Sequence, residues 1–63
     1  MIITGWKAGA NTVDAIRAVK NHTGMSLKES KQLIESALEG KSVKLPDDFV
    51  LREDLEECNF IIS

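Results

Sequence analysis

Two helix start signals follow one another in the first half of the sequence, and this pair constrains the fold more than any other feature. The first signal is Asn11, a residue type that is preferred at the N-cap. Asp14 follows it at a position where a carboxylate stabilises the positive end of a helix. Apolar residues then recur at helical spacing. The pattern predicts a helix from about Thr12 to about His22, which stops near Gly24.

The second start signal comes almost at once, in the segment 26–29. Ser26 and Glu29 have the spacing of a capping box, in which each side chain bonds a free backbone N–H. Apolar residues supply one side of the helix that follows, and Gly40 stands where a glycine commonly ends a helix. Two helices that start so close together form a helical hairpin or corner.

Three short segments have the character of β-strands. Ile2–Trp6 is apolar and β-prone, Ser42–Leu45 alternates and is closed by a proline, and Phe60–Ile62 ends the chain. A third helix is indicated before the last strand, with a start anywhere from about Asp48 to Arg52. The alternative is that Phe49–Leu51 extends a hairpin from the second strand.

The order of these elements is therefore β-α-α-β-α-β. Two consecutive helices between strands exclude a simple doubly wound sheet. The sequence predicts an α+β fold, with three helices packed on one face of a small, three-stranded, mainly antiparallel sheet. At 63 residues, we expect residues 1–63 to form a single domain.

The core of this domain has to rest on apolar side chains. One cysteine and one histidine allow neither an internal disulfide nor a structural zinc site. We expect Trp6 to anchor the core and Cys58 to be a small buried hydrophobe. A few core residues of the first helix should stay partly exposed at a binding face. The expected core is Val13, Ile16, Val19, Leu27, Leu33, Ile34, Leu38, Val43, Leu55 and Ile61.

No catalytic or ligand-binding pattern is present. Glu56 and Glu57 should raise the pKa of the neighbouring Cys58 thiol and make it unreactive. His22 is expected to be an exposed residue near a helix C-terminus, without a carboxylate or serine companion. The acidic cluster after residue 52 lacks the pattern of a calcium loop, and the glycines form no phosphate-binding motif. We therefore expect no enzyme activity, no cofactor and no metal.

The N-terminal residues and the lone thiol indicate where the protein works. The first residues carry neither a secretory signal nor a membrane span. A single unpaired cysteine suits a reducing compartment. We expect a cytoplasmic protein that does not enter a membrane.

Charge is divided unevenly along the chain, although the net charge is only −2. Residues 7–31 contain five Lys or Arg against two Asp or Glu, a balance of +3. Residues 32–63 contain three against eight, a balance of −5. An asymmetry of this kind orients a domain toward a charged partner.

The segments 8–20 and 23–35 closely resemble the C-terminal domain of the bacterial ribosomal stalk protein, the seven/twelve protein of the large subunit. That family has a Gly-Ala-Asn-Lys start, an Ile-Lys-x-Val-Arg core and a Thr-Gly-Leu-x-Leu-Lys-Glu-Ala-Lys run. It also has the order β-α-α-β-α-β. The lysine of the family's first motif is Thr12 here, which removes one positive charge.

The resemblance implies a protein-binding domain that recruits a translational GTPase through the face of its first two helices. The family's dimerising segment and hinge are not seen, so we expect a monomer, and such a small domain suits a compact genome such as a phage's. Carried over position by position, the contact face consists of Val13, Ile16, Arg17, Lys20, Gly24, Glu29 and Lys31.

Two other functions stay open on the sequence alone. The substrate-delivery adaptor of the Clp protease has a similar fold, and such an adaptor would hold a peptide end in an acidic-lined apolar pocket. Nucleic-acid binding through the basic helices is the other, using Arg17, Lys20, Lys28 and Lys31. The acidic overall balance and the lack of nearby aromatic residues argue against nucleic acid as the partner.

Overall fold

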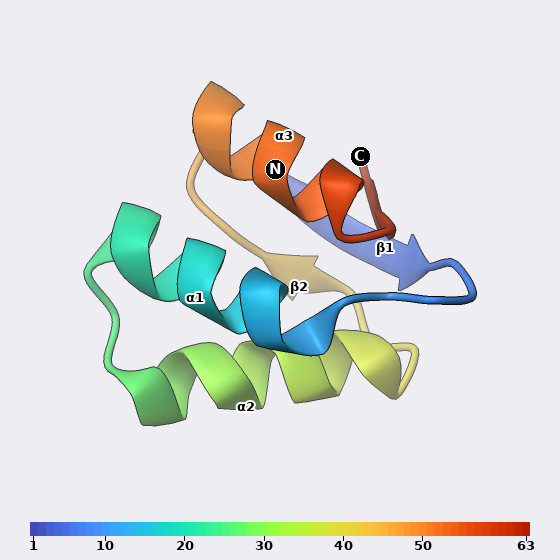
Figure 1. Ribbon diagram of the computed structural model, residues 1–63, viewed down its shortest axis with the longest axis horizontal. Helices are drawn as coiled ribbons and strands as arrows, with labels where there is room; N and C mark the ends of the chain where they lie inside the picture. The colour runs from blue at the N-terminus through green and yellow to red at the C-terminus, as the bar shows by residue number, and fades with distance from the viewer.

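The computed structural model describes all 63 residues and has the expected α+β architecture. Three helices and three strands follow one another in the order β-α-α-β-α-β (Figure 1). The third helix begins at the early end of its expected range, so the alternative hairpin at 49–51 is not formed. The elements are β1 (Ile2–Trp6), α1 (Thr12–Thr23), α2 (Leu27–Leu38), β2 (Val43–Lys44), α3 (Phe49–Glu57) and β3 (Phe60–Ile62).

The sheet has β1 in its centre, with β2 and β3 antiparallel to it on either side. Ile3 pairs with Ile62, but Gly5 pairs with Ile61, so β1 advances two residues while β3 advances one. The extra residue is Thr4, whose hydroxyl donates a hydrogen bond of 3.4 Å to the Ile61 carbonyl. This bulge is the one irregularity in the sheet's register.

The three helices lie together in front of the sheet, with α1 between α2 and α3 (Figure 1). α1 packs against both neighbouring helices, α2 packs against β1 and β2, and α3 packs against β3. Small buried residues, Ala15 and Ala18, occur on the side of α1 that faces the interior. They let the central helix approach its neighbours closely. None of the three helices is both long enough and apolar enough to cross a membrane.

Side chains cap the start of each helix. The side-chain oxygen of Asn11 accepts from the Asp14 N–H at 3.1 Å, as expected for α1. Asp48 caps α3 by accepting from two backbone N–H groups of its first turn. At α2 the Ser26 hydroxyl oxygen accepts from the Glu29 N–H at 3.1 Å. The Glu29 carboxylate differs from the expected box, because it accepts from the Ser26 hydroxyl at 3.2 Å.

The core agrees with the expectation in its centre and differs at its edges. Val19, Ile34, Val43 and Leu55 are buried, as expected, and Ile16, Leu33 and Leu38 are half-buried against them. The core prediction is wrong for three residues, because their side chains are largely exposed to solvent. These are Val13, Leu27 and Ile61.

Each of the three errors has a geometric reason. β3 directs Phe60 and Ile62 into the core, so Ile61 between them points to the other face of the sheet. Leu27 is the first residue of α2, where the helix has just begun. Val13 lies on the side of α1 opposite its buried alanines.

Trp6 is also not the core residue that the sequence indicated. Its side chain is 45% exposed. The indole N–H donates a hydrogen bond of 3.2 Å to the Leu38 carbonyl, one of the free carbonyls at the end of α2. This hydrogen bond therefore links the end of α2 to the last residue of β1.

Candidate functional site

The α1 residues of the expected contact face form a continuous stripe. Val13, Ile16, Arg17 and Lys20 are separated by three and four residues, so they neighbour one another along one side of the helix. Val13 is 63% exposed, and the two cations are exposed as well. Ile16 is half-buried and packs against the core. The stripe is therefore a small apolar centre with two cations beside it.

Both cations of this stripe are without an ionic partner inside the molecule. The ion pairs of the protein involve the N-terminus, His22 and Lys41, and none of them includes Arg17 or Lys20. Lys31 of α2 is equally unpaired. These charges remain available to a partner of opposite sign.

The two α2 residues of the expected face point in different directions. Glu29 and Lys31 are two residues apart, which separates them by about 200° around a helix. Glu29 lines a pocket of about 260 Å³ with Met25 and Leu33, and no residue of α1 lines that pocket. Lys31 is exposed on the other side of α2. A single flat contact therefore does not include both side chains in its centre.

Gly24 is placed at the exposed junction between α1 and α2. It ends α1 in the left-handed conformation, with φ of 75°, and its N–H donates to the Lys20 carbonyl at 3.1 Å. A Cβ atom added at this position would meet nothing within 4 Å. The glycine is thus required by the backbone conformation of the helix end, independently of any partner.

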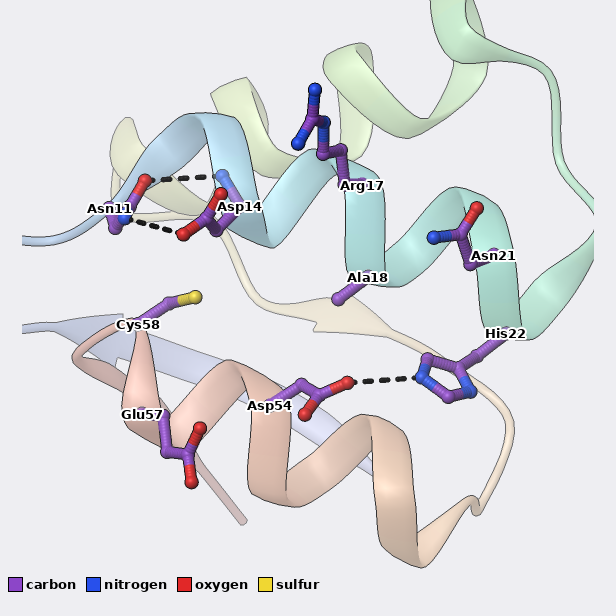
Figure 2. Close-up of a pocket in the computed structure, with 9 residues that line it drawn as sticks. All are labelled: Asn11, Asp14, Arg17, Ala18, Asn21, His22, Asp54, Glu57 and Cys58. Carbon is purple, nitrogen blue, oxygen red and sulfur yellow. Dashed lines mark hydrogen bonds and ion pairs between the residues drawn. The ribbon is translucent and has the colours of Figure 1, made fainter.

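A polar groove of about 380 Å³ lies on the other flank of α1, between this helix and α3. Figure 2 shows Asp14, Asp54 and Glu57 around it, with Ala18 and Cys58 between the two helices. The sequence did not indicate this groove, because its two sides are more than thirty residues apart in the chain. The remaining residues that line it are Asn11, Arg17, Asn21 and His22.

His22 has carboxylate companions, contrary to the sequence expectation. Its Nε2 lies 3.0 Å from Asp54 Oδ2, and its Nδ1 lies 3.9 Å from Asp48 Oδ2 (Figure 2 shows the shorter contact). The imidazole therefore joins the last turn of α1 to the cap and the second turn of α3. No local sequence signal could have shown this, since both aspartates come from a distant segment.

Cys58 is the small buried hydrophobe that the sequence predicted, at 8% exposure. Burial raises the pKa of its thiol, and the negative charges of Asp14, Asp54 and Glu57 raise it further. The expectation about Glu57 was therefore right, whereas Glu56 does not contribute. Elsewhere, no group of three His, Cys, Asp or Glu side chains is arranged to hold a metal ion.

Comparisons with known proteins agree on one family. The family model described as the ribosomal protein L7/L12 C-terminal domain matches residues 2–46. The large ribosomal subunit protein bL12 of Actinobacillus pleuropneumoniae serotype 5b (strain L20) is 43% identical over 54 residues, which are 82% of this chain and 44% of that protein. The bL12 of Haemophilus ducreyi is 42% identical over 53 residues, 81% of this chain and 44% of that protein.

The same relationship holds for a shorter stretch of another relative. The bL12 of Pseudoalteromonas translucida (strain TAC 125) is 57% identical over 37 residues, 59% of this chain and 29% of that protein. The chain thus spans less than half the length of the curated relatives it matches. No solved structure gives a significant match. From the family model and these relatives, the chain belongs to the family of ribosomal protein L7/L12 C-terminal domains.

Proposed function

We propose that this domain is a non-enzymatic binding module, which recruits a translational GTPase through α1 and the adjoining part of α2. The observation that carries the proposal is the exposed stripe on α1, an apolar centre beside two unpaired cations. Membership of the L7/L12 family supports it, since the resemblance to the stalk domain implies factor recruitment through these helices.

The stripe suits an acidic, amphipathic partner surface. Val13 and Ile16 supply the apolar contact, which excludes water and holds the partner in place. Arg17 and Lys20 attract carboxylates and speed the encounter. Lys31 adds a third cation from α2. Gly24, with no side chain, leaves the junction between the helices open to a partner's backbone.

The first residue of α1 weakens this contact relative to the stalk domain that the sequence resembles. Thr12 stands at the position of the lysine in that family's Gly-Ala-Asn-Lys motif. A Thr12→Lys variant should therefore bind an acidic partner more tightly at low salt, with little change at high salt.

The test compares two valines that differ in position but not in type. Val13 and Val50 are both exposed, at 63% and 52%, and lie on different helices. Val13→Ser should weaken the binding of a purified bacterial translational GTPase by roughly tenfold, because it removes a desolvated apolar contact. Val50→Ser should leave that affinity unchanged. Calorimetry measures both, and thermal melting checks that each variant folds.

The opposite result would reject the proposed face. If Val50→Ser weakens GTPase binding and Val13→Ser does not, the GTPase binds at α3. If the wild-type domain shows no binding to any translational GTPase, the partner is another protein.

A further inference from the structure

The sheet has a second face that no helix covers. All three helices lie on one side of the sheet (Figure 1). An antiparallel sheet with one solvated face normally alternates apolar and polar residues, so that the solvated face is polar. β1 and β3 depart from this pattern, because Ile2 and Ile61 lie on the uncovered face and are 38% and 43% exposed. Continuous apolar runs such as Phe60–Ile62 are typical of strands that are covered on both faces.

The strand register joins the two isoleucines into one patch. Ile2 and Ser63 are opposite each other, since each N–H donates to the other's carbonyl, at 3.2 and 2.8 Å. Ile61 precedes Ser63 by two residues, so it is the diagonal neighbour of Ile2 and within reach of a long side chain. A Cβ atom added at Gly5 would lie 3.6 Å from Ile61 Cδ1, so the Ile61 side chain extends over the glycine. The patch therefore extends along β1 from Ile2 to Gly5.

The charged residues beside this patch are lysines. Lys44 of β2 is the register partner of Ile2, so the two side chains are neighbours on the uncovered face. Lys7 follows Gly5 by two residues and continues the ladder to β3, since its N–H donates to the Asn59 carbonyl at 2.8 Å. Alternation along the ladder places Lys7 at the other end of the patch. Neither lysine forms an ion pair, and the three strands contain no Asp or Glu.

We propose that the uncovered face of the sheet docks an acidic amphipathic helix of a partner protein. Charge complementarity selects the occupant, because the patch has an unpaired lysine at each end and no carboxylate in its strands. From Ile2 to Lys7 the chain advances about 16 Å, at about 3.3 Å per residue, which is the length of about three helical turns. A docked helix adds a third layer and buries the isoleucines that the sheet leaves in water.

This face lies on the opposite side of the domain from the α1 stripe. Val13 is on the side of α1 away from its buried alanines, whereas the patch is on the side of the sheet away from the helices (Figure 1). Both surfaces can therefore be occupied at the same time. The family match ends at residue 46, so family membership does not supply Ile61. The proposal does not depend on which protein binds the α1 stripe.

The experiment titrates the isotope-labelled domain with synthetic helical peptides at about 0.15 M salt, where long-range attraction is screened. The α1 stripe also attracts acidic peptides, so the domain carries Arg17→Gln and Lys20→Gln. The first peptide is an alanine-based helix of about 15 residues, with two leucines on one side and glutamates beside them. One matched peptide replaces the leucines by alanine, and another replaces the glutamates by lysine.

The first peptide is expected to shift the backbone signals of Ile2, Lys44 and Ile61. The peptide without leucines should bind more weakly, and the peptide with lysines should not bind. Ile61→Thr and Lys44→Glu should each weaken binding of the first peptide by roughly tenfold, since one removes an apolar contact and the other reverses a charge at the patch. Lys44→Glu decides the question if Ile61→Thr destabilises the sheet.

Two matched variants serve as controls. Val50→Thr makes a comparable apolar-to-polar change at an exposed position of α3. Lys28→Glu makes the same charge change as Lys44→Glu, at an exposed position of α2. Neither control should alter binding of the peptide, and urea unfolding checks that every variant keeps the fold.

Several results would overturn the proposal. Equal weakening by Lys28→Glu and Lys44→Glu would mean attraction by net charge alone. Shifts confined to the helices would place the peptide elsewhere. If the sheet signals move with protein concentration in the absence of peptide, and sedimentation shows a dimer, the occupant is a second copy of the chain. If anionic lipid vesicles broaden the sheet signals while the peptide leaves them in place, the face binds a membrane surface.

Discussion

At the scale of single residues, Ser30 is a polar side chain in an apolar place. Its hydroxyl is fully buried on α2 and has no hydrogen-bond partner. A buried polar group without a partner has lost its contacts with water and gained none in return, which costs about 1–3 kcal/mol. The stalk sequences that this chain resembles have alanine in the corresponding place of the Lys-Glu-Ala-Lys run. Ser30 is therefore a site where the chain departs from its family at the expense of stability.

Replacing Ser30 by alanine should raise the free energy of unfolding by about 1 kcal/mol. Part of this gain comes from the better helix propensity of alanine. Ser36→Ala in the same helix measures the contribution of helix propensity alone, because Ser36 is only half-buried. Urea unfolding of both variants measures the difference. A Ser30→Ala variant no more stable than Ser36→Ala would mean that the hydroxyl has a partner in solution.

Cys58 should make the stability of the fold depend on pH in the alkaline range. The pKa of its thiol is raised from the ordinary 9.0, first by burial and then by nearby carboxylates. A raised pKa in the folded state means that the thiol's contribution to stability is complete below the ordinary value. This contribution is lost as the pH rises through the raised pKa, because ionisation then favours the unfolded chain.

The expected outcome is a loss of stability relative to a Cys58→Ala variant when the pH is raised from about 7 to about 10. The variant has all other titrating groups in common with the wild type, so their effects cancel in the comparison. Urea unfolding at the two pH values gives the measurement. A parallel decline of both proteins would show that the thiol ionises equally easily in the folded and unfolded states.

At the scale of elements, the sequence predicted those features that depend on neighbouring residues. The N-caps at Asn11 and Ser26 and the glycine end of α1 need only a few consecutive positions, and the structure confirms them. The bulge at Thr4 and the orientation of Ile61 depend on how β1 and β3 pair across more than fifty residues. Such pairing leaves no local signal, which is why the core assignment at β3 was wrong.

The burial of α2 against the sheet can be tested by two apolar residues of the same helix. Ile34 is fully buried, whereas Leu27 is 59% exposed. Ile34→Ala should lower the free energy of unfolding by about 2–4 kcal/mol, since it leaves a cavity in the core. Leu27→Ala should change it much less. Comparable losses from both variants, seen in urea unfolding, would contradict the register of α2.

His22 should connect α1 and α3 energetically. A double-mutant cycle with His22→Gln and Asp54→Asn is expected to give a coupling of about 0.5 kcal/mol, because both side chains are partly exposed. The matched cycle uses Glu53→Gln, one residue away on α3, and should show no coupling. Equal couplings in both cycles would mean that His22 senses only the general charge of α3.

At the scale of the whole molecule, the uneven charge along the sequence becomes a division in space. The unpaired cations Arg17, Lys20 and Lys31 lie on α1 and α2, and four of the eight carboxylates in residues 32–63 lie on α3. The stripe on α1 could be predicted, because helical spacing and the family resemblance both place it. The groove could not, since it exists only where α1 and α3 are brought together.

This division predicts that charge and apolar contact contribute separately when the α1 stripe binds its partner. Arg17→Glu with Lys20→Glu should slow association and weaken binding mostly at low salt, because exposed charges steer the encounter. Ile16→Ala should instead speed dissociation at any salt, because it removes a desolvated apolar contact. The binding free energy should weaken by about 1–3 kcal/mol. Glu53→Lys on α3 should change neither rate by much.

Surface-binding kinetics with a purified translational GTPase, at two salt concentrations, distinguish these effects. Sedimentation of the wild type and of each variant checks whether they are monomers, as we expect. Since Ile16 is half-buried, its variant also needs an unfolding curve, so that a loss of fold is not mistaken for a loss of contact. If the double charge variant dissociates faster at high salt, Arg17 and Lys20 lie inside the desolvated contact. If only Glu53→Lys changes the rates, the GTPase binds the acidic helix α3 and not the α1 stripe.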